Sequence, residues 1–370
     1  MAMDEFFRQI CTVFGINGTY TSYDVIKCGN INDTYRMDVR TESGKVSYIV
    51  QRINHNVFRY PEHIMANVSA VTEHIERKLE QARDKDIKRK VLRFYHTADG
   101  SLLYTSPGGD YWRVMNYIYN AESHNRGGIR LLHRTGEAFG EFQRQLSDFP
   151  AEKLYETIPD FHNTEKRFER LDASVAADPA GRAALCGAEL DYLYSMRDLA
   201  SFFRLSHERG DIPTRVTHND TKCNNVMFDR DTKKPLAVID LDTVMPGFAA
   251  HDYGDAVRFA ANTAAEDEAD ISKVSLDLRL CKSFTEGFVS KISGTLGREE
   301  ILTLPDGLLV ITLELAVRFI TDYIDGDVYF KTSKPDHNLI RARNQIALCR
   351  DIKAKMDNIR SIVGAYCPDV

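Results

Sequence analysis

Residues 216–255 read VTHNDTKCNNVMFDRDTKKPLAVIDLDTVMPGFAAHDYGD, and this stretch decides the fold. It contains two short apolar runs, 226–228 and 236–239, on either side of the polar segment 229–235. Two such runs around a polar loop of a few residues predict a β-hairpin. The polar residues that flank the hairpin are therefore expected to gather at its open end.

The register of this hairpin determines which residues meet. With the turn centred between Thr232 and Lys233, antiparallel pairing puts Asn225 opposite Asp240. Mg²⁺ prefers hard oxygen ligands and is usually held by one or two carboxylates together with substrate phosphates. We therefore predict Asn225 and Asp240 as the ligands of Mg²⁺. Asp242 lies on the same strand face as Asp240 and is either a second ligand or an orienting group.

His218 and Asp220 precede the hairpin in the spacing H-x-D-x-x-x-x-N, which ends at Asn225. With an Asp at the end of the next strand, this spacing resembles the catalytic loop and metal-binding Asp of the protein-kinase-like superfamily. A hydroxyl that attacks a γ-phosphate needs a carboxylate to orient it and accept its proton. We therefore predict Asp220 as the catalytic base. His218 is the second catalytic candidate, and we expect it to brace the loop rather than to do chemistry.

Composition limits the class of protein. The chain has 370 residues, 43% of them hydrophobic and 28% charged, with a net charge of −6. These values are typical of a soluble globular protein long enough for two lobes, and they give no sign of the clustered positive charge of a nucleic-acid-binding surface. No apolar run approaches the roughly 20 residues of a membrane span, and the amino terminus lacks the plan of a signal peptide. We expect a cytoplasmic protein without a nucleic-acid or membrane partner.

The segment before the catalytic stretch predicts a small β-rich lobe. Apolar positions at helical spacing over 64–79 predict one helix. The strand candidates are 20–27, 34–39, 46–53, 91–95, 101–104 and 111–119. This order matches a kinase amino-terminal lobe. We therefore predict an α+β, bilobal protein-kinase-like fold, with a small nucleotide-binding lobe at 1–119 and a larger, mainly helical catalytic lobe at 120–370, which would also hold the acceptor.

The link between the first two strands, CGNINDTYRMDV at 28–39, is the candidate phosphate loop. In a kinase-like lobe this turn lies over the nucleotide phosphates, and a small residue lets backbone N–H groups approach them. Gly29, Asn32 and Thr34 are the candidate contacts. With a single glycine, an ordinary hairpin turn is an equally good interpretation.

The third strand, YIVQRIN, lacks the lysine that usually pairs with the phosphates. Arg52 would have to supply the cation, or Gln51 a neutral donor, although arginine is not equivalent to lysine in geometry. A structural salt bridge of Arg52 is the alternative. Glu73, on the following helix, is named as its possible ion-pair partner.

The strand YWRVMNYIYN at 111–120 leads into the connection between the lobes. Its backbone edge at 115–118 is predicted to pair with an adenine ring, as kinase hinges do. Asn116 and Ile118 are therefore candidate nucleotide contacts. This placement rests on chain order alone.

From about residue 120 the chain becomes helical. Apolar stripes over 132–146 and 185–203 predict core-facing helices. The apolar helix predicted over 308–324 places four polar residues on one face. Those residues are Glu314, Arg318, Asp322 and Asp325. They are either a solvated face with ion pairs four residues apart or the polar wall of an acceptor site, because charged groups can grip hydroxyl-rich sugars.

From Lys27 to Asp351 the chain is similar to the aminoglycoside phosphotransferase and choline kinase family, and most similar to the bacterial N-acetylhexosamine 1-kinases. The strings that carry this resemblance are THNDTKCNN, VIDLDTVMPG, HDYGD, YIVQRINHNVF and ELAVRFITDYIDGDVYF. The resemblance implies ATP as co-substrate, Mg²⁺, and phosphorylation of the anomeric hydroxyl of N-acetylglucosamine or N-acetylgalactosamine. It places Arg318 and Tyr329 near the sugar, and Asp322 is a further candidate.

Two alternatives remain open at this point. One is a kinase of another small alcohol, such as an aminoglycoside, choline or methylthioribose. A cationic acceptor favours a wall of carboxylates, whereas the wall here includes Arg318. The other is a nucleotide-binding pseudokinase that acts as a scaffold, which the missing lysine keeps open.

Overall fold

Residue contacts divide the chain into two compact units. The computed structural model describes residues 3–27 and 31–367. Unit 1 comprises Met1–Glu122, Glu152–Ile158 and Met227–Met245, and unit 2 comprises Ser123–Ala151, Pro159–Val226 and Pro246–Val370. Unit 1 thus includes two later segments that a division at residue 119 leaves out.

Unit 1 is built on a five-stranded antiparallel sheet of order β1-β2-β3-β5-β4. A smaller sheet of order β6-β8-β9 carries the later hairpin. The elements are α1 (Met3–Val13), β1 (Thr19–Ile26), β2 (Asp33–Thr41), β3 (Gly44–Ile53), α2 (Pro61–Gln81), α3 (Ile87–Lys90), β4 (Tyr104–Thr105), β5 (Tyr111–Asn116), β6 (Ala121–Glu122), β8 (Val226–Asp229) and β9 (Pro235–Val238).

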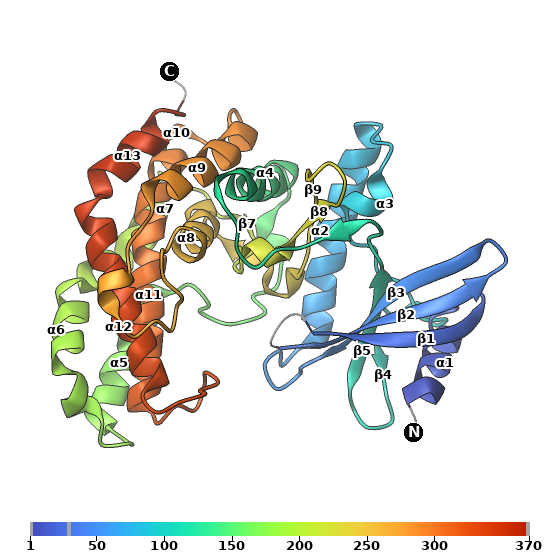
Figure 1. Cartoon of the computed structure of the whole chain (residues 1–370), viewed down its shortest axis with the longest axis horizontal. Helices are drawn as coiled ribbons and strands as arrows, with labels where there is room; N and C mark the ends of the chain where they lie inside the picture. Colours follow the sequence, from blue (N-terminus) through green and yellow to red (C-terminus); the bar gives the residue numbers. More distant parts are fainter. Residues whose placement is uncertain (1–2, 28–30, 368–370) are drawn as a thin grey trace. The chain divides into compact units, whose positions relative to one another are not determined.

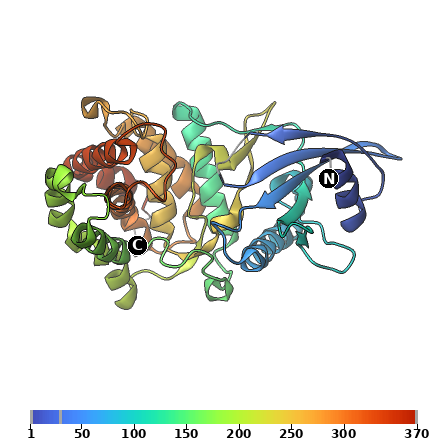
Figure 2. The same ribbon diagram turned by 90° about the horizontal axis from the view of Figure 1, so that it is seen from below.

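The large sheet has one apolar face and one partly polar face, because side chains alternate along each strand. The apolar face carries Val50 and Val114, which pack with Phe7 of α1. The other face carries Arg113, whose Nη1 lies 3.6 Å from the Sδ of Met65 in α2. Helices α1 and α2 therefore cover opposite faces of the sheet, and Figures 1 and 2 show both helices beside it.

The predicted order of elements in this unit is confirmed for the first three strands and the long helix. Segment 91–95 forms only an isolated bridge between Phe94 and Met115. One reason is that the side chain of Asn116 accepts the Arg93 N–H at 2.8 Å. Helix α1 was not predicted, although its buried Phe6, Phe7 and Ile10 contribute to the core of the unit.

Unit 2 is mainly helical, as predicted. Its helices are α4 (Ile129–Gln145), α5 (Thr164–Ala177), α6 (Gly187–Ser195), α7 (Phe202–Glu208), α8 (Ala249–Ala260), α9 (Leu278–Ile292), α10 (Arg298–Leu302), α11 (Leu304–Ile324), α12 (His337–Ala354) and α13 (Met356–Gly364), and its short strands are β7 (Arg215–Thr217) and β10 (Met245–Gly247). Together with unit 1 this confirms the predicted α+β class.

Glycines allow two helices of unit 2 to touch at the backbone. A Cβ at Gly136 or Gly140 of α4 would lie 2.2 Å from the carbonyl oxygen of Phe284 or 2.4 Å from that of Phe288, both in α9. A Cβ at Gly287 of α9 would lie 2.0 Å from the His133 carbonyl oxygen. Since real Cβ atoms do not approach oxygen so closely, only glycine permits this crossing.

The helix predicted over 185–203 is broken. Helix α6 ends at Ser195, a 3-10 turn spans Arg197–Ser201, and α7 begins at Phe202. Leu185 precedes α6 and is 63% exposed. Met196 leaves the helical conformation, with φ −105° and ψ 3°, and is buried at the break.

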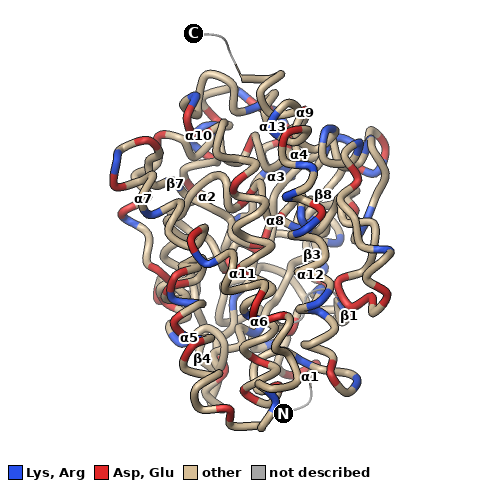
Figure 3. Tube along the Cα trace, turned by 90° about the vertical axis from the view of Figure 1, so that its left-hand side faces the viewer, with Lys and Arg blue, Asp and Glu red and all other residues tan. Residues whose placement is uncertain are grey.

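Among the described residues, no helix combines the length and apolar character needed to cross a membrane. Charged residues of both signs are interspersed along the trace (Figure 3). This mixture agrees with the small net charge of the sequence, −6.

Candidate active site

The loop that carries Asp220 is tied to helix α8 by one buried carboxylate. Asp252, in the first turn of α8, accepts the N–H of His218 at 2.9 Å and the N–H of Asn219 at 2.8 Å. Gln143 of α4 donates to the same carboxylate at 2.8 Å, and the Thr221 hydroxyl donates to the Asp252 carbonyl at 2.6 Å. Asn219 has φ +64°, which L-residues rarely adopt unless their surroundings enforce it. Asp252 therefore holds the loop in one conformation.

His218 lies beneath this loop and is fully buried. Its ring packs edge-on against Phe139 and Phe142, with centroids 5.6 and 5.9 Å away. Its Nδ1 accepts the N–H of Asp220 at 3.2 Å. These contacts are those of a brace for the loop.

The carboxylate of Asp220 is partly exposed and has two polar neighbours. Asn225 Nδ2 donates to its Oδ2 at 3.1 Å and to its backbone carbonyl at 2.8 Å. Lys222 Nζ lies 2.5 Å from Oδ1. Burial alone would lower the pKa of Lys222, but the negative charges of Asp220 and Asp255 outweigh it and raise that pKa. Lys222 was missed in the sequence, although its position two residues after Asp220 was available as a signal.

The predicted register of the hairpin is wrong. Asp229 donates its N–H to the Lys234 carbonyl at 2.9 Å and accepts from the Lys233 N–H at 2.8 Å, so the turn is centred one residue earlier than predicted. The cause is Asp229 itself, whose Oδ1 accepts the N–H groups of Asp231 and Thr232 and the Thr232 hydroxyl. An early Asx-type turn of this kind competes with strand pairing.

Asn225 and Asp240 both lie just outside the strands, because β8 begins at Val226 and β9 ends at Val238. Asn225 belongs to unit 2 and Asp240 to unit 1, and their joint binding of one metal ion stays a prediction. Each nevertheless suits Mg²⁺ by itself. Among the described residues no hydrogen bond reaches the Asn225 amide oxygen, and Asp240 presents an exposed carboxylate.

Asp242 is buried, unlike Asp240 two residues before it. Its side chain is 3% exposed, and its Oδ1 lies 2.6 Å from Nη1 of Arg113. Asn32 Nδ2 donates to its Oδ2 at 2.7 Å. Within unit 1, Oδ2 therefore has a hydrogen-bond partner and Oδ1 an ion-pair partner. Of the two predicted roles, this geometry favours the orienting group.

The candidate phosphate-loop residues divide into three cases. Gly29 lies outside the described residues. Asn32 donates to Asp242, and the Thr34 hydroxyl accepts from Gln51 Nε2 at 2.9 Å. Arg52 is 43% exposed and forms ion pairs with Asp33 and Asp110. The salt-bridge interpretation of Arg52 is therefore the one observed, while its contact with phosphate stays a prediction.

Glu73 does not pair with Arg52 as suggested, because it accepts from the Ser69 hydroxyl at 2.6 Å on its own helix. The predicted open edge at 115–118 is also wrong in its first half. The Asn116 N–H donates to the Arg93 carbonyl at 3.0 Å, and its side-chain oxygen accepts the Arg93 N–H. The backbone groups of residues 117 and 118 make no hydrogen bond to other backbone groups among the described residues. A contact with adenine is thus still open only at that end.

The solvated-face interpretation of the α11 residues is wrong. Glu314 and Asp322 are 1% and 4% exposed. Glu314 accepts from the Thr164 hydroxyl at 2.8 Å and lies 3.0 Å from His162 Nδ1, whereas Asp325 pairs with Arg170 at 2.6 Å. None of these contacts is an ion pair between neighbouring turns of α11. The acceptor-wall interpretation remains a prediction.

Asp322 holds the loop that carries Tyr329. Its Oδ1 accepts the Tyr329 N–H at 2.8 Å, and its Oδ2 accepts the Phe330 N–H at 2.9 Å and Asn338 Nδ2 at 2.8 Å. With both oxygens engaged, the observed role of Asp322 is to anchor the loop. Its direct contact with a sugar stays a prediction.

Arg318 lies among aromatic rings at the edge of this loop. Its guanidinium carbon is 5.7 Å from the ring centroid of Phe161, 5.9 Å from that of Tyr329 and 5.4 Å from that of Phe330. Tyr329 is 65% exposed. We call Phe161, Arg318, Tyr329 and Phe330 the Arg318 cluster. The cluster combines aromatic rings, which can pack against the apolar face of a ligand, with a guanidinium, which can donate hydrogen bonds to its polar groups.

The charge of Glu314 affects stability at low pH. Burial alone would raise its pKa, but the charges of His162, Arg318 and Arg167 outweigh burial and lower it to about 2. A depressed carboxyl pKa stabilises the fold above the unfolded value and loses that contribution as the pH falls toward the folded value. The full loss is on the order of 3 kcal/mol.

We therefore expect the free energy of unfolding of the wild type to fall more steeply than that of Glu314→Gln as the pH decreases from about 6 to about 3. Urea unfolding at several pH values measures both curves. Glu169→Gln, which replaces an exposed carboxylate of the same unit, is the matched control and should run parallel to the wild type. A constant gap between wild type and Glu314→Gln over this range would contradict the assigned pKa.

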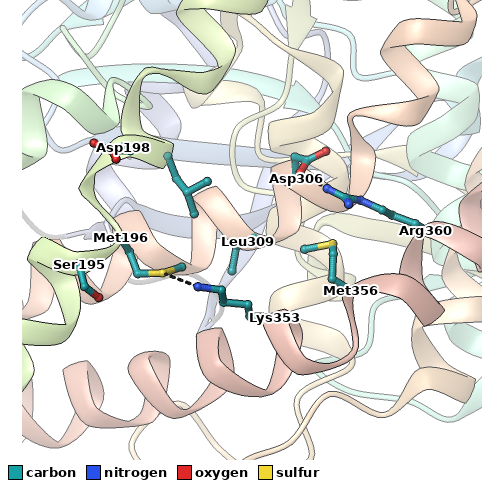
Figure 4. A pocket seen from close by; sticks show the side chains of 9 residues that line it. Ser195, Met196, Asp198, Asp306, Leu309, Lys353, Met356 and Arg360 are labelled. Atoms are coloured by element: carbon teal, nitrogen blue, oxygen red, sulfur yellow. Dashed lines mark hydrogen bonds and ion pairs between the residues drawn. The ribbon is translucent and has the colours of Figure 1, made fainter.

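Unit 2 also contains a cavity that is lined by other residues. It has a volume of about 350 Å³ and is lined by residues that include Met196, Asp306, Lys353 and Arg360 (Figure 4). Within it, Arg360 pairs with Asp306 at 3.2 Å, and Lys353 Nζ lies 3.5 Å from the Met196 sulfur. None of the predicted site residues lines it.

Several solved structures share this fold. An aminoglycoside phosphotransferase from Alicyclobacillus acidocaldarius aligns with a TM-score of 0.60 and 14% identity, over 95% of this chain and 96% of its own. A microcompartment-associated aminopropanol kinase aligns with 0.56 and 14%, over 96% and 98%. A choline/ethanolamine kinase family protein from Mesorhizobium loti aligns with 0.53 and 12%, over 98% and 99%. At this identity the likeness confirms the predicted protein-kinase-like fold.

The sequence comparison identifies the family. Residues 24–274, about two thirds of the chain, match the phosphotransferase enzyme family, abbreviated APH. The match spans the candidate phosphate loop, the candidate catalytic loop with Asp220 and the following Asp240. The chain therefore belongs to the phosphotransferase enzyme family.

Proposed function

We propose that this phosphotransferase moves the γ-phosphoryl group of ATP to the anomeric C1 hydroxyl of an N-acetylhexosamine, with Mg²⁺ as cofactor. The observation that carries the proposal is the partly exposed carboxylate of Asp220 in a loop fixed by Asp252. A rigidly held carboxylate that is still accessible is what a hydroxyl nucleophile requires.

The reaction is a direct in-line transfer. Asp220 accepts a hydrogen bond from the C1 hydroxyl and takes its proton as the oxygen bonds to the γ-phosphorus. The bond from that phosphorus to the β,γ-bridging oxygen breaks, and ADP leaves with the electron pair. Lys222 and Asn225 fix the Asp220 carboxylate during this step. Mg²⁺, held by Asn225 and Asp240, would neutralise charge on the β- and γ-phosphates.

The Arg318 cluster is the proposed acceptor wall. A hexose presents apolar C–H faces and hydroxyl groups, which match aromatic rings and a guanidinium respectively. Buried Glu314 and Asp322 hold the residues around it, through Thr164 and the Tyr329 N–H. A neutral acceptor suits this wall better than a cationic one, because the charged member of the cluster is an arginine.

We expect Arg318→Met to raise the KM for the sugar by about 10-fold to 100-fold, since a hydrogen bond to a charged group contributes about 1.5 to 3 kcal/mol. The KM for ATP should stay close to that of the wild type. Arg170→Met is the matched control, because Arg170 is a 65% exposed arginine that pairs with Asp325. Unchanged sugar kinetics in Arg318→Met would remove the cluster from the acceptor site.

The proposed function is tested by an assay of ADP release with Mg²⁺ and ATP over a panel of acceptors. The panel contains N-acetylglucosamine, N-acetylgalactosamine, plain hexoses, choline, methylthioribose and an aminoglycoside. We expect turnover to be fastest with an N-acetylhexosamine. Turnover with a different acceptor only would support the kinase activity but contradict the proposed N-acetylhexosamine substrate. No turnover on the whole panel, with ATP still bound, would support the pseudokinase instead.

A further inference from the structure

A buried ion pair lies on the α2-facing side of the sheet in unit 1. The side chains of Arg113, in β5, and Asp242 are each 3% exposed, and Arg113 Nη1 lies 2.6 Å from Asp242 Oδ1. Taking two charges out of water is expensive, and removing one partner leaves the other uncompensated. The positions of Arg113 and Asp242 are therefore mutually dependent.

Further polar side chains complete a network around this pair. Gln51 Oε1, in β3, accepts from Arg113 Nε at 3.0 Å and from Nη2 at 2.7 Å. Asn32 donates to Asp242 Oδ2 and accepts the Asn54 N–H at 3.0 Å. The network thus joins the region before β2, strands β3 and β5, and the segment after β9.

Strand register separates Arg52 from this network. Gln51 pairs with Arg113 across β3 and β5, whereas Arg52 pairs with Trp112. Neighbouring residues of a strand point to opposite faces, and Trp112 packs against Phe6 of α1, with ring centroids 4.4 Å apart. Arg52 therefore emerges on the α1 side of the sheet, away from Asp242.

Helix α2 places a thioether rather than a carboxylate beside Arg113. Met65 Sδ lies 3.6 Å from Arg113 Nη1. The acids Glu73 and Glu76 of this helix have other partners, the Ser69 hydroxyl and Arg93. The counter-charge of Arg113 consequently comes from Asp242, two residues after the candidate metal ligand Asp240.

The backbone at Asp240 needs such support. Asp240 has φ +61°, a conformation that costs about 1 to 3 kcal/mol in a non-glycine residue and persists where the surroundings impose it. The 3-10 turn Leu241–Thr243 follows at once, with Asp242 at its centre. On its far side, Asn67 Nδ2 donates to the Val244 carbonyl at 2.9 Å.

We propose that Arg113 is a positioning residue for metal binding, which acts through Asp242 to fix the turn and with it the Asp240 carboxylate. Arg52, which the sequence suggested as the cation that contacts the phosphates, lies on the opposite face of the sheet. This inference rests on the proposed phosphotransferase function, because it concerns the metal that accompanies the nucleotide.

The test measures the dissociation constant of ADP by calorimetry with saturating Mn²⁺ and again in EDTA. The ratio of the constant in EDTA to the constant with Mn²⁺ reports how strongly the metal supports nucleotide binding. A loss of packing alone does not change this ratio. Removing a residue that orients a metal ligand lowers metal affinity by about 10-fold to 100-fold. We expect Arg113→Met to lower the ratio by that factor and Arg113→Lys to lower it less.

Two further variants sharpen the test. Arg93→Met removes another ion-paired arginine of unit 1, one that is 33% exposed, and should leave the ratio at the wild-type value. In the wild type, Gln51 contacts the Arg113 guanidinium. The double variant Gln51→Lys, Arg113→Met replaces that guanidinium by an ammonium on residue 51, and it should restore the ratio. If Arg113→Met does not fold, Arg113→Lys and the double variant decide in its place.

The inference is overturned if Arg113→Met keeps the wild-type ratio, if the double variant does not restore it, or if Arg52→Met lowers it more than Arg113→Met does. The proposed function survives each of these results. If the wild type binds ADP equally well with Mn²⁺ and in EDTA, the proposed function itself fails, and the inference fails with it.

Discussion

Replacing Asp220 by asparagine is expected to lower kcat by about 10³-fold, because the acceptor hydroxyl loses the carboxylate that takes its proton. The amide keeps the shape of the side chain and still accepts the hydrogen bond from Asn225 Nδ2. The loop should therefore keep its conformation, and the dissociation constant of ATP should remain that of the wild type. Steady-state kinetics and calorimetry measure the two quantities separately.

The matched control is Asp211→Asn, which replaces a partly exposed aspartate of the same unit that pairs with Arg209. It should leave kcat unchanged. Wild-type turnover in Asp220→Asn would exclude Asp220 as the base. A loss of both turnover and ATP binding would point to a collapsed loop rather than to a missing base.

The second large effect concerns stability. Gly287→Ala is expected to lower the free energy of unfolding by about 3 kcal/mol or more, because overpacking a tight contact forces the backbone to move. The new Cβ would lie 2.0 Å from the carbonyl oxygen of His133 and 2.9 Å from the N of Glu137, both in α4. These are backbone atoms of a helix and cannot move singly. Denaturant unfolding gives the difference from the wild type.

Gly187→Ala is the control for this substitution. Gly187 begins α6 with φ −56°, and a Cβ there would meet no atom within 4 Å. Alanine favours helix over glycine by about 1 kcal/mol, so this variant should be as stable as the wild type or more so. Equal stability of Gly287→Ala and the wild type would show that α4 and α9 do not touch as described.

The sequence predicts much of this fold because local pattern and tertiary structure agree in it. Helix α2 and strand β3 appear where apolar spacing places them. The exceptions have physical causes. The early turn at Asp229 arises from side-chain hydrogen bonds that override the local pattern, and the helix predicted over 185–203 is interrupted at the buried Met196.

The candidate site was predictable to the extent that its residues are close in the chain. Asp220 and Asn225 share one short loop, so their spacing is visible in the sequence. Arg113 and Asp242 are far apart in the chain, and they are joined only by the strand register that places Arg113 on the Gln51 side of the sheet. Predicting this ion pair requires the register between β3 and β5, which is difficult to derive from a single sequence.

Asp252 illustrates an intermediate case. The string HDYGD contains two acidic residues, Asp252 and Asp255, and the preference of a helix start for acids does not by itself tell them apart. Asp252 accepts two backbone N–H groups of the loop that carries Asp220, and it also accepts a hydrogen bond from Gln143. Asp255 instead pairs with Arg258 at 2.7 Å, and burial lowers the pKa of His251 to about 3, with the charge of His162 adding to this shift.

The reaction proposed for this protein transfers the γ-phosphoryl group of ATP to the anomeric hydroxyl of an N-acetylhexosamine. The most direct test is phosphorus NMR of the product formed from N-acetylglucosamine or N-acetylgalactosamine with ATP and Mg²⁺. We predict a phosphomonoester signal coupled to the anomeric proton, which appears with wild type and not with Asp220→Asn. A signal coupled to the protons at C6, or ATP consumed without any sugar phosphate, would contradict the account.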